Sequence, residues 1–423
     1  MRNCRVPASQ HVCDLACHWH YSQTKHVRRR PRGPAGAVAR RGAGSPVKFR
    51  IEREVLAEAV TWAARGLPSR PPVPVLAGML LEANSEGTIT LSAFDYEVST
   101  RITVPATVDE SGKALVHGKL LADISRSLPT KPIDVVEDGA KVTLECGSSR
   151  FSLLRMPSDE YPSLPVPPQS SGTVAGDSFT QAVAQVSVAA DRSDTLPILN
   201  GVRMEVAGDR ITLLATDRYR LATRDLQWNP ADPELTTVVL IPARTLAETA
   251  KALGAAAPIE LALGQAAGGE GLVGFEAGQR RTTTRLLDGD YPKVSSIFPS
   301  SIDTEAVIET GPLIEAVRRV SLVAERNTPV RLRFTDGQLI IDAGTGDDAQ
   351  ASEGLEATLY GPDIDIAFNP HYLLDGLTAV NSRHSRLGFT QSTRPAVLSG
   401  QDDADGQPDS SYRYVLMPVR FAT

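Results

Sequence analysis

The sequence predicts an α+β protein built from three tandem copies of one module. Residues 47–423 number 377, close to three times about 125, and each third opens with a short strand followed by an amphipathic helix. Each third later repeats a strand and a helix, and further strands follow. Two helices among alternating strands in every third indicate helices packed on one face of antiparallel sheets.

The first strand–helix element of each third is recognised by its spacing of apolar residues. These elements cover residues 48–65, 174–190 and 306–324, and their helices carry apolar residues at i, i+3, i+4 and i+7. The second elements read LVHGKLLADISRSLP, VLIPARTLAETAKALG and IAFNPHYLLDGLTAV. Pro- and Ser-rich joints separate the thirds. We therefore expect domains at residues 47–170, 171–298 and 299–423.

Two aspartates occupy equivalent positions in the first two thirds. Gly78 and Gly201 are 123 residues apart, and Asp95 and Asp217, which follow them, are 122 apart. A catalytic pair would need both carboxylates close together, but they belong to different modules. We expect each one to cap a turn or to pair with an arginine.

The body of the chain lacks the residue patterns of enzymes. Beyond residue 46 the histidines are His117, His371 and His384, each at a different place in the repeat. The sequence contains no G-x-S-x-G elbow and no G-x-x-x-x-G-K-[ST] phosphate loop. A nuclease or hydrolase built on such modules would also need a metal-binding acidic cluster. The sequence therefore predicts no catalytic residue, no metal and no cofactor.

Composition bounds the class and location of the protein. Hydrophobic residues make up 41% and charged residues 22% of the 423-residue chain, a normal globular balance. No stretch approaches about 18 uninterrupted apolar residues, so we expect no membrane span. Only Cys146 follows residue 46, so the body needs no disulfide and suits a reducing cytoplasm.

Residues 1–46 differ from the body in charge. They carry nine Lys and Arg against one acid, Asp14, whereas the remaining 35 basic and 49 acidic residues give a net charge of −14. Cys13, Cys17 and His18, near His20 and Cys4, could be read as zinc ligands, but no second Cys-x-x-Cys or His-x-x-x-His follows. The segment is either a basic arm that contacts nucleic acid or a partner, or a disordered or mis-started extension. The abrupt start of periodic sequence at Val47 favours the second alternative.

Two surface features point to binding rather than catalysis. The helices carry scattered positive charge in an acidic body, at Arg65, Lys119, Arg126, Arg244, Lys251, Arg318 and Arg319. These residues indicate either loose contact with phosphates, without base reading, or an ordinary solvated helix surface. The apolar run from Val415 to Arg420 indicates a pocket for a partner peptide, a terminal strand that completes the third sheet, or both.

Five phrases in order resemble the family of the DNA polymerase III beta subunit, the bacterial sliding clamp. They are VKFRIEREVLAEAV, SRPPVPVLAGMLLEA, ATDRYRLA, LDGDYPKVSSIFP and the terminal YVLMPVR. Their sequence resembles that of actinobacterial members of the family. The resemblance implies a head-to-tail homodimeric ring that encircles double-stranded DNA without reading its sequence. It also implies a non-catalytic processivity factor that tethers the replicative polymerase alpha subunit, the clamp loader, repair polymerases and ligase. The alternative is a specialised second clamp copy, for example one resistant to an inhibitor.

The resemblance also implies site residues. DNA contacts would come from Arg70, Lys119 and Arg126. The dimer interface would join Phe151 and Leu153 of one copy to Leu322 and Val323 of the other. A groove for peptides resembling Gln-Leu-x-Leu-Phe would be formed by Leu199, Thr216, Arg218, Tyr219, Arg220, Leu221, Pro292, Ile297, Val415, Met417, Pro418, Val419 and Arg420. Tyr219 stands where a histidine is common in the family, and Val419 where a methionine is common.

Overall fold

A computed structural model describes residues 46–193, 195–264, 271–294, 297–324, 328–344 and 349–420. These residues all belong to one compact unit of the chain. The expected basic extension lies outside the described residues, apart from Pro46. The rejected zinc reading of its cysteines and histidines lies outside them too.

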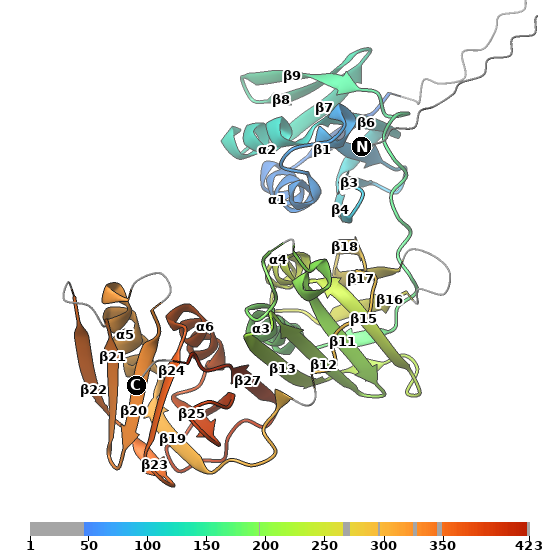
Figure 1. Ribbon diagram of the computed structural model, residues 1–423. Coiled ribbons are helices and arrows are strands. Elements are labelled where there is room, and N and C mark those ends of the chain that lie inside the picture. Colours follow the sequence, from blue (N-terminus) through green and yellow to red (C-terminus); the bar gives the residue numbers. More distant parts are fainter. Residues whose placement is uncertain are drawn as a thin grey trace, which may run out of the picture. The chain divides into compact units, whose positions relative to one another are not determined.

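Module 1 contains the helices α1 (Arg53–Ala63) and α2 (Gly118–Ser127), which lie side by side (Figure 1). Helix α1 buries Leu56, Ala59, Val60 and Ala63, the i, i+3, i+4, i+7 stripe that its sequence predicts. The strands are β1 (Lys48–Ile51), β2 (Gly78–Ala83), β3 (Thr88–Phe94), β4 (Val98–Pro105), β5 (Thr107–Glu110), β6 (Gly112–His117), β7 (Ile133–Asp138), β8 (Lys141–Cys146) and β9 (Ser149–Met156).

Module 2 repeats this order with α3 (Gly176–Ser187) and α4 (Ala243–Leu253). Helix α4 ends at Gly254, whose φ of 81° is the left-handed conformation that glycine adopts without strain. The strands are β10 (Gly172–Val174), β11 (Gly201–Ala207), β12 (Arg210–Thr216), β13 (Arg220–Gln227), β14 (Asn229–Pro230), β15 (Thr236–Pro242), β16 (Ile259–Leu263), β17 (Leu272–Ala277) and β18 (Arg280–Arg285).

Module 3 contains α5 (Thr310–Val320) and α6 (Pro370–Val380). Helix α6 begins where the Asn369 side chain accepts hydrogen bonds from the backbone N–H groups of His371 and Tyr372, and Pro370 occupies its first position. The strands are β19 (Thr304–Glu309), β20 (Val330–Thr335), β21 (Gln338–Ala343), β22 (Ala351–Glu356), β23 (Thr358–Tyr360), β24 (Ile364–Phe368), β25 (His384–Phe389), β26 (Ala396–Gln401) and β27 (Tyr412–Leu416).

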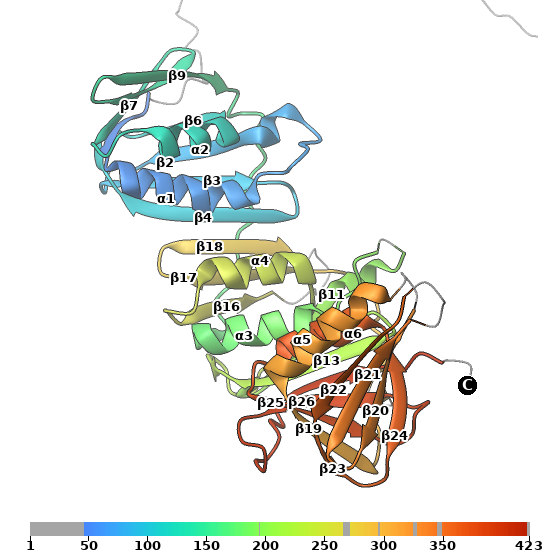
Figure 2. The same ribbon diagram turned by 90° about the vertical axis from the view of Figure 1, so that its left-hand side faces the viewer.

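The predicted α+β architecture with two helices in each third is confirmed. Every strand pairing is antiparallel, and the helix pairs α1–α2, α3–α4 and α5–α6 each cover one face of their sheets (Figure 2). The aliphatic core between helices and sheets includes a few large aromatic side chains, such as Phe49, Phe179 and Phe334. Within the described ranges, no helix is long and apolar enough to cross a membrane.

Neighbouring modules are joined by strand pairing. The last strand of module 2, β18, pairs with β4 of module 1 from Arg280↔Ile102 to Thr284↔Val98. The last strand of module 3, β27, pairs with β13 of module 2 in the equivalent register. We call these pairings junction 1–2 and junction 2–3. Strand β27 thereby confirms that the C-terminal apolar run completes a sheet.

Two strands at equivalent positions have no such neighbour among the described residues. Strand β22 of module 3 corresponds to β4 and β13, but it pairs only with β21. Strand β9 of module 1 corresponds to β18 and β27. It pairs with β8 along its length and with β6 only at Arg155 and Met156. Each end of the chain of modules therefore leaves one half of a junction open.

Candidate functional site

A tight turn between β12 and β13 at junction 2–3 carries several of the predicted groove residues. The Asp217 side chain accepts hydrogen bonds from the backbone N–H groups of Tyr219 and Arg220, both at 3.0 Å. The Thr216 hydroxyl donates to the Arg220 carbonyl at 2.6 Å and accepts from the N–H of Arg218 at 3.2 Å. These side-chain bonds hold Arg218 at a φ of 80°, a conformation that a non-glycine residue rarely adopts. The expectation that Asp217 caps a turn is confirmed.

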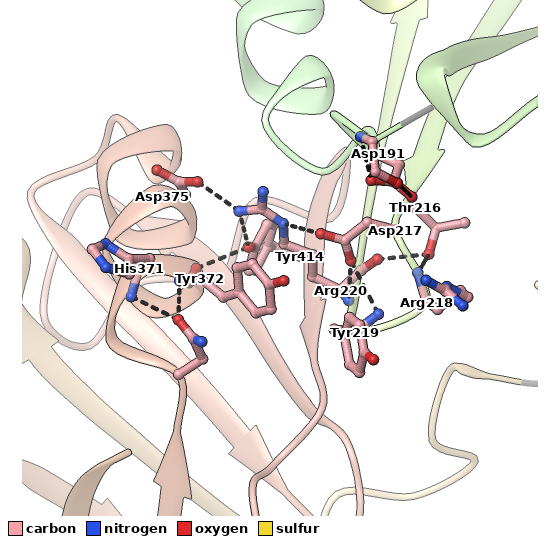
Figure 3. A network of polar contacts seen from close by, with 12 residues as sticks. Asp191, Thr216, Asp217, Arg218, Tyr219, Arg220, His371, Tyr372, Asp375 and Tyr414 are labelled. Atoms are coloured by element: carbon pink, nitrogen blue, oxygen red, sulfur yellow. Dashed lines mark hydrogen bonds and ion pairs between the residues drawn. The ribbon is translucent and has the colours of Figure 1, made fainter. Parts of the chain in front are cut away.

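A buried guanidinium links this turn to module 3. Arg220 is 5% exposed and donates to Asp217 at 2.9 Å and to Asp375 of α6 at 2.6 Å (Figure 3). It also donates to the Tyr414 hydroxyl at 3.4 Å, and that hydroxyl donates to the Tyr372 carbonyl at 2.8 Å. Burial alone would lower the pKa of Arg220, but Tyr414, Asp375 and Asp217 outweigh burial and raise the pKa. The residue therefore stays charged and fully partnered.

An aromatic pair lies at the surface above this guanidinium. The Tyr219 ring, 53% exposed, stacks on the Tyr372 ring with centroids 6.1 Å apart and an interplanar angle of 22°. The Arg220 guanidinium carbon lies 4.4 Å from the centroid of Tyr372, so a cation supports the inner ring. The Met417 N–H donates to the Tyr219 carbonyl at 2.9 Å, which ties the C-terminal segment to the turn. An exposed and braced aromatic pair is well suited to binding an apolar or aromatic side chain.

A small apolar cluster underlies the same turn on the sheet face that turns away from the helices. Leu214, Leu221 and Val415 form it with Val294, and Tyr291, Ile297 and Phe298 pack against them. The Tyr291 hydroxyl accepts a hydrogen bond from the Thr216 N–H at 3.0 Å. The segment that follows β18 therefore connects the turn to the apolar cluster. We call the turn, the aromatic pair, this cluster and residues 417–420 the partner surface.

The predicted groove residues fall into three classes of exposure at this surface. Leu199, Thr216, Arg220, Leu221 and Val415 are buried. Ile297, Met417, Pro418 and Val419 are half-buried, and Arg218, Tyr219, Pro292 and Arg420 are exposed. The buried members support the surface, so only the other eight offer substantial side-chain area to a partner. The backbone N–H of Asp191 donates to the Leu199 carbonyl at 2.9 Å. Burial would raise the pKa of the Asp191 carboxyl, but hydrogen bonds from Ser193 and Arg192, together with the charge of Arg218, lower that pKa.

Junction 1–2 repeats the turn without apolar side chains at the strand positions equivalent to Leu214, Leu221 and Val415. The Asp95 side chain accepts from the N–H groups of Glu97 at 2.9 Å and Val98 at 2.6 Å, so the capping expected of Asp95 is confirmed. Tyr96, the equivalent of Arg218, has a φ of 76°. Where junction 2–3 has Leu214, Leu221 and Val415, however, the strand registers place Ser92, Ser99 and Thr283. The partner surface is thus specific to junction 2–3.

A second group of predicted residues lines the helix side of module 1. Lys119 and Arg126 border a hollow of about 560 Å³ together with Arg65, and its other lining residues include Leu67, Pro68 and Ala122. Arg70 is exposed on the loop that contributes Pro71 to this hollow. Arg126 pairs with Asp123 at 2.6 Å. Among the described residues Arg65, Arg70 and Lys119 form no ion pair, so their charges remain available to an anion.

Comparison with known proteins assigns the family. Residues 47–165, 173–293 and 295–420 match the models of the N-terminal, central and C-terminal domains of the DNA polymerase III beta subunit. The chain belongs to the DNA polymerase III beta subunit family, the bacterial sliding clamps. It is similar to the beta sliding clamp of Streptomyces coelicolor, with 56% identity over 376 residues that cover 89% of this chain and 100% of that protein.

Two further relatives support the assignment. The beta sliding clamp homolog GriR of Streptomyces muensis is 46% identical over 376 residues, which cover 89% of this chain and 100% of the relative. The crystal structure of the DNA polymerase sliding clamp from Bacillus subtilis superposes with a TM-score of 0.82 at 25% identity, covering 89% of this chain and 100% of that chain. The predicted sliding-clamp resemblance and its actinobacterial character are therefore confirmed.

The residues expected at the clamp's dimer interface are exposed to very different degrees. Leu322 is 84% exposed, Val323 is half-buried and Phe151 is 37% exposed. Leu153 is only 3% exposed because its side chain packs into the core. Its neighbour Leu154 is 71% exposed instead. The interface expectation for Leu153 therefore does not fit its position in the clamp module.

Sequence reasoning missed Tyr372, Asp375, Tyr414 and Tyr291 of the clamp's partner surface. Tyr372 and Asp375 lie on α6, far along the chain from the turn that they contact. One signal was available: α4 has Thr245 where the equally long α6 has Tyr372, an aromatic residue added to one copy of the repeat. Within the described ranges, no three His, Cys, Asp or Glu side chains are grouped so as to hold a metal ion.

Alkaline pH should weaken the support that Tyr291 gives to this turn. Burial raises the pKa of Tyr291 to about 12, above its ordinary value of 10.0. The folded state therefore favours the neutral phenol, and its stabilising contribution is complete below pH 10 and falls as the pH approaches 12. We expect the free energy of unfolding, measured by urea titration from pH 9 to 11.5, to fall less steeply in Tyr291→Phe than in the wild type. An unchanged slope in Tyr291→Phe, or an equal reduction in the exposed control Tyr96→Phe, would contradict this assignment.

Proposed function

We propose that two copies of this clamp close head to tail into a ring around duplex DNA and tether replication proteins through the partner surface. The observation that carries this proposal is the pair of open half-junctions, β22 in module 3 and β9 in module 1. Within the chain, the equivalent strands pair twice in one register. A third pairing of the same kind, made between two copies, joins unlike edges, and such a contact can close into a ring.

The observed registers specify the proposed contact between copies. Arg101 faces Arg281 at junction 1–2, and Thr223 faces Arg413 at junction 2–3. The equivalent residues at the open edges are Ser352 of β22 and Arg150 of β9, so the proposed pairing sets them opposite each other. Phe151 then faces Ala351, a small residue that leaves room for the phenyl ring of Phe151.

Exposed apolar side chains flank both open edges. Phe151 and Leu154 belong to β9, and Leu322 follows α5, the helix that contacts β22. Arg319 of α5 pairs with Glu353 of β22 at 2.6 Å and holds helix and edge strand together. Burial of these apolar side chains would supply the driving force, and the backbone edge would supply the register. We therefore include Leu154 in the interface, with Phe151, Leu322 and Val323.

The helix side of the ring would face DNA. The body has a net charge of −14, yet Arg65, Arg70 and Lys119 gather on this side without ion pairs among the described residues. Contacts of this kind attract phosphates regardless of base sequence. An encircled duplex needs no tight grip, because the closed ring prevents escape while it slides. Arg126 would add to this contact, although Asp123 partly neutralises it.

The partner surface would bind short peptides resembling Gln-Leu-x-Leu-Phe. The exposed Tyr219–Tyr372 pair offers a rigid platform for the apolar side chains, and Met417 and Val419 offer adaptable walls. We propose that the alpha subunit of the replicative polymerase, the clamp loader, repair polymerases and ligase all bind here. The partners would then compete for one surface on each copy.

Three further statements belong to the proposal. The clamp performs no chemical step itself, acts in the cytoplasm, and is divided into domains near residues 47–170, 171–298 and 299–423. The family matches over each third support this division. The alternative, a specialised second copy, receives less support, because identity to the Streptomyces coelicolor clamp exceeds identity to GriR over the same length.

Retention on closed DNA tests the ring. We expect the protein, loaded by a clamp loader with ATP onto nicked circular plasmid, to remain on the plasmid through gel filtration in 0.5 M salt, about the range where exposed charge contacts are screened. Cutting the plasmid once should release it, because a topological link needs a closed or blocked DNA. Equal retention on linear DNA would point to simple electrostatic binding, and no retention on either would remove the clamp function. A metal-dependent loss of the plasmid would indicate a nuclease.

Substitution of an exposed leucine at the proposed interface should weaken the dimer. Leu322→Glu would bury an unpaired carboxylate between copies, and we expect dimerisation at least about 10-fold weaker by sedimentation velocity. Val238→Glu is the matched control, because Val238 is also exposed, at 53%, but lies in β15 away from the open edges. A Leu322→Glu protein that dimerises as tightly as the control would exclude the proposed interface.

Peptide binding tests the partner surface. Fluorescence polarisation of a labelled Gln-Leu-x-Leu-Phe peptide should show micromolar binding to the wild type, weakened at least about 10-fold in Tyr219→Ala with Met417→Ala. Tyr96→Ala, which removes an exposed tyrosine from the equivalent turn of module 1, should bind as the wild type does. Absence of binding by a folded wild-type dimer would favour the specialised second copy.

A further inference from the structure

We infer that Asp375 is a positioning residue for partner binding: its carboxylate fixes the Arg220 guanidinium, which fixes the Tyr219–Tyr372 pair. This inference rests on the proposed peptide site and adds a residue that acts on it through Arg220. Asp375 lies on α6 of module 3, and its carboxylate reaches the Arg220 guanidinium of module 2 at 2.6 Å. It therefore acts across the junction between two modules.

Each step of the connection is a direct contact. Asp217 uses one oxygen for the N–H groups of the turn and the other for the Arg220 guanidinium, so the position of Arg220 and the shape of the turn are coupled. The opposite side of the guanidinium contacts Asp375 and supports the Tyr372 ring from 4.4 Å. Tyr219 rests on that ring and belongs to the turn itself. Loss of the Asp375 charge would thus release the turn and the inner ring together (Figure 3).

The chain contains its own comparison for this arrangement. Helices α4 and α6 have equal length, so Glu248 is the equivalent of Asp375 and Thr245 that of Tyr372. The strand registers make Val98 the equivalent of Arg220, and Thr282 that of Tyr414. At junction 1–2 the four equivalent side chains, Val98, Thr245, Glu248 and Thr282, all line a hollow of about 300 Å³. At junction 2–3 the corresponding volume holds the guanidinium and the two tyrosines.

The equivalent carboxylate makes a different contact. Glu248 pairs with Arg244 within the same helix at 3.0 Å, and both side chains are largely exposed. It does not reach across the junction in the described structure. Modules 1 and 2 therefore associate through the same strand pairing but without a buried charge network. The network accompanies the partner surface and is not a general requirement for joining modules.

The first test measures the turn in the absence of any peptide. In the full-length dimer, Asp375→Asn should speed hydrogen exchange at the backbone amides of Tyr219, Arg220 and Met417, which the turn network now holds. Glu248→Gln, the matched change at the equivalent position, should leave those amides as in the wild type. Unchanged exchange in Asp375→Asn would overturn the positioning role, whatever the peptide data show.

The second test measures peptide affinity in a double-mutant cycle. Asp375→Asn should weaken binding of the labelled Gln-Leu-x-Leu-Phe peptide about 10-fold while the dimer persists, and Tyr414→Phe should weaken it in the same direction. In a Tyr219→Ala background the further loss from Asp375→Asn should shrink to less than about 2-fold, because the platform is already gone. Additive losses would identify a merely structural role and overturn the inference. A wild type that binds no peptide would instead overturn the proposed site on which it rests, and the inference with it.

Discussion

An edge strand carries a row of backbone N–H and C=O groups that need partners, and this constraint organises the whole chain. Modules 2 and 3 each end in a strand that completes a sheet of the module before it, as β18 does for β4 and β27 for β13. The pairing places the end of one module beside the turn of another. A surface composed of two modules is therefore a direct result of how the sheets are completed.

The same pairing creates two geometrically similar junctions that differ in their side chains. Junction 2–3 has leucines and a valine on its outer sheet face, whereas junction 1–2 has serines and a threonine at the same positions. Both turns are capped by an aspartate, so the backbone is prepared twice. Junction 2–3 alone, of these two, combines apolar side chains at these strand positions with a braced aromatic pair, the kind of surface that favours a desolvated contact.

The repeated architecture could be predicted from sequence because periodicity and turn chemistry are local. Apolar spacing located the first helix of each module, and the repeated strand–helix element located the second. The equivalent positions of Asp95 and Asp217 were correctly expected to cap a turn. The inward orientation of Leu153 could not be predicted, because the strand alternates between faces and only packing decides which residue is covered. The roles of Tyr372 and Asp375 were missed because they depend on contacts between residues more than 150 positions apart. Such contacts exist only once the strands have paired.

The two open edges also have a consequence for assembly size. A contact between unlike ends propagates from copy to copy, and it stops only when the accumulated rotation brings the last edge back to the first. The summed bends and twists at the two junctions inside one chain therefore set the number of copies in the assembly. The open edges themselves do not set it. A small change in the angle at either internal joint would alter that sum. The same edges would then build a larger ring or an open-ended filament. The packing at the junctions inside one molecule therefore governs whether the assembly closes.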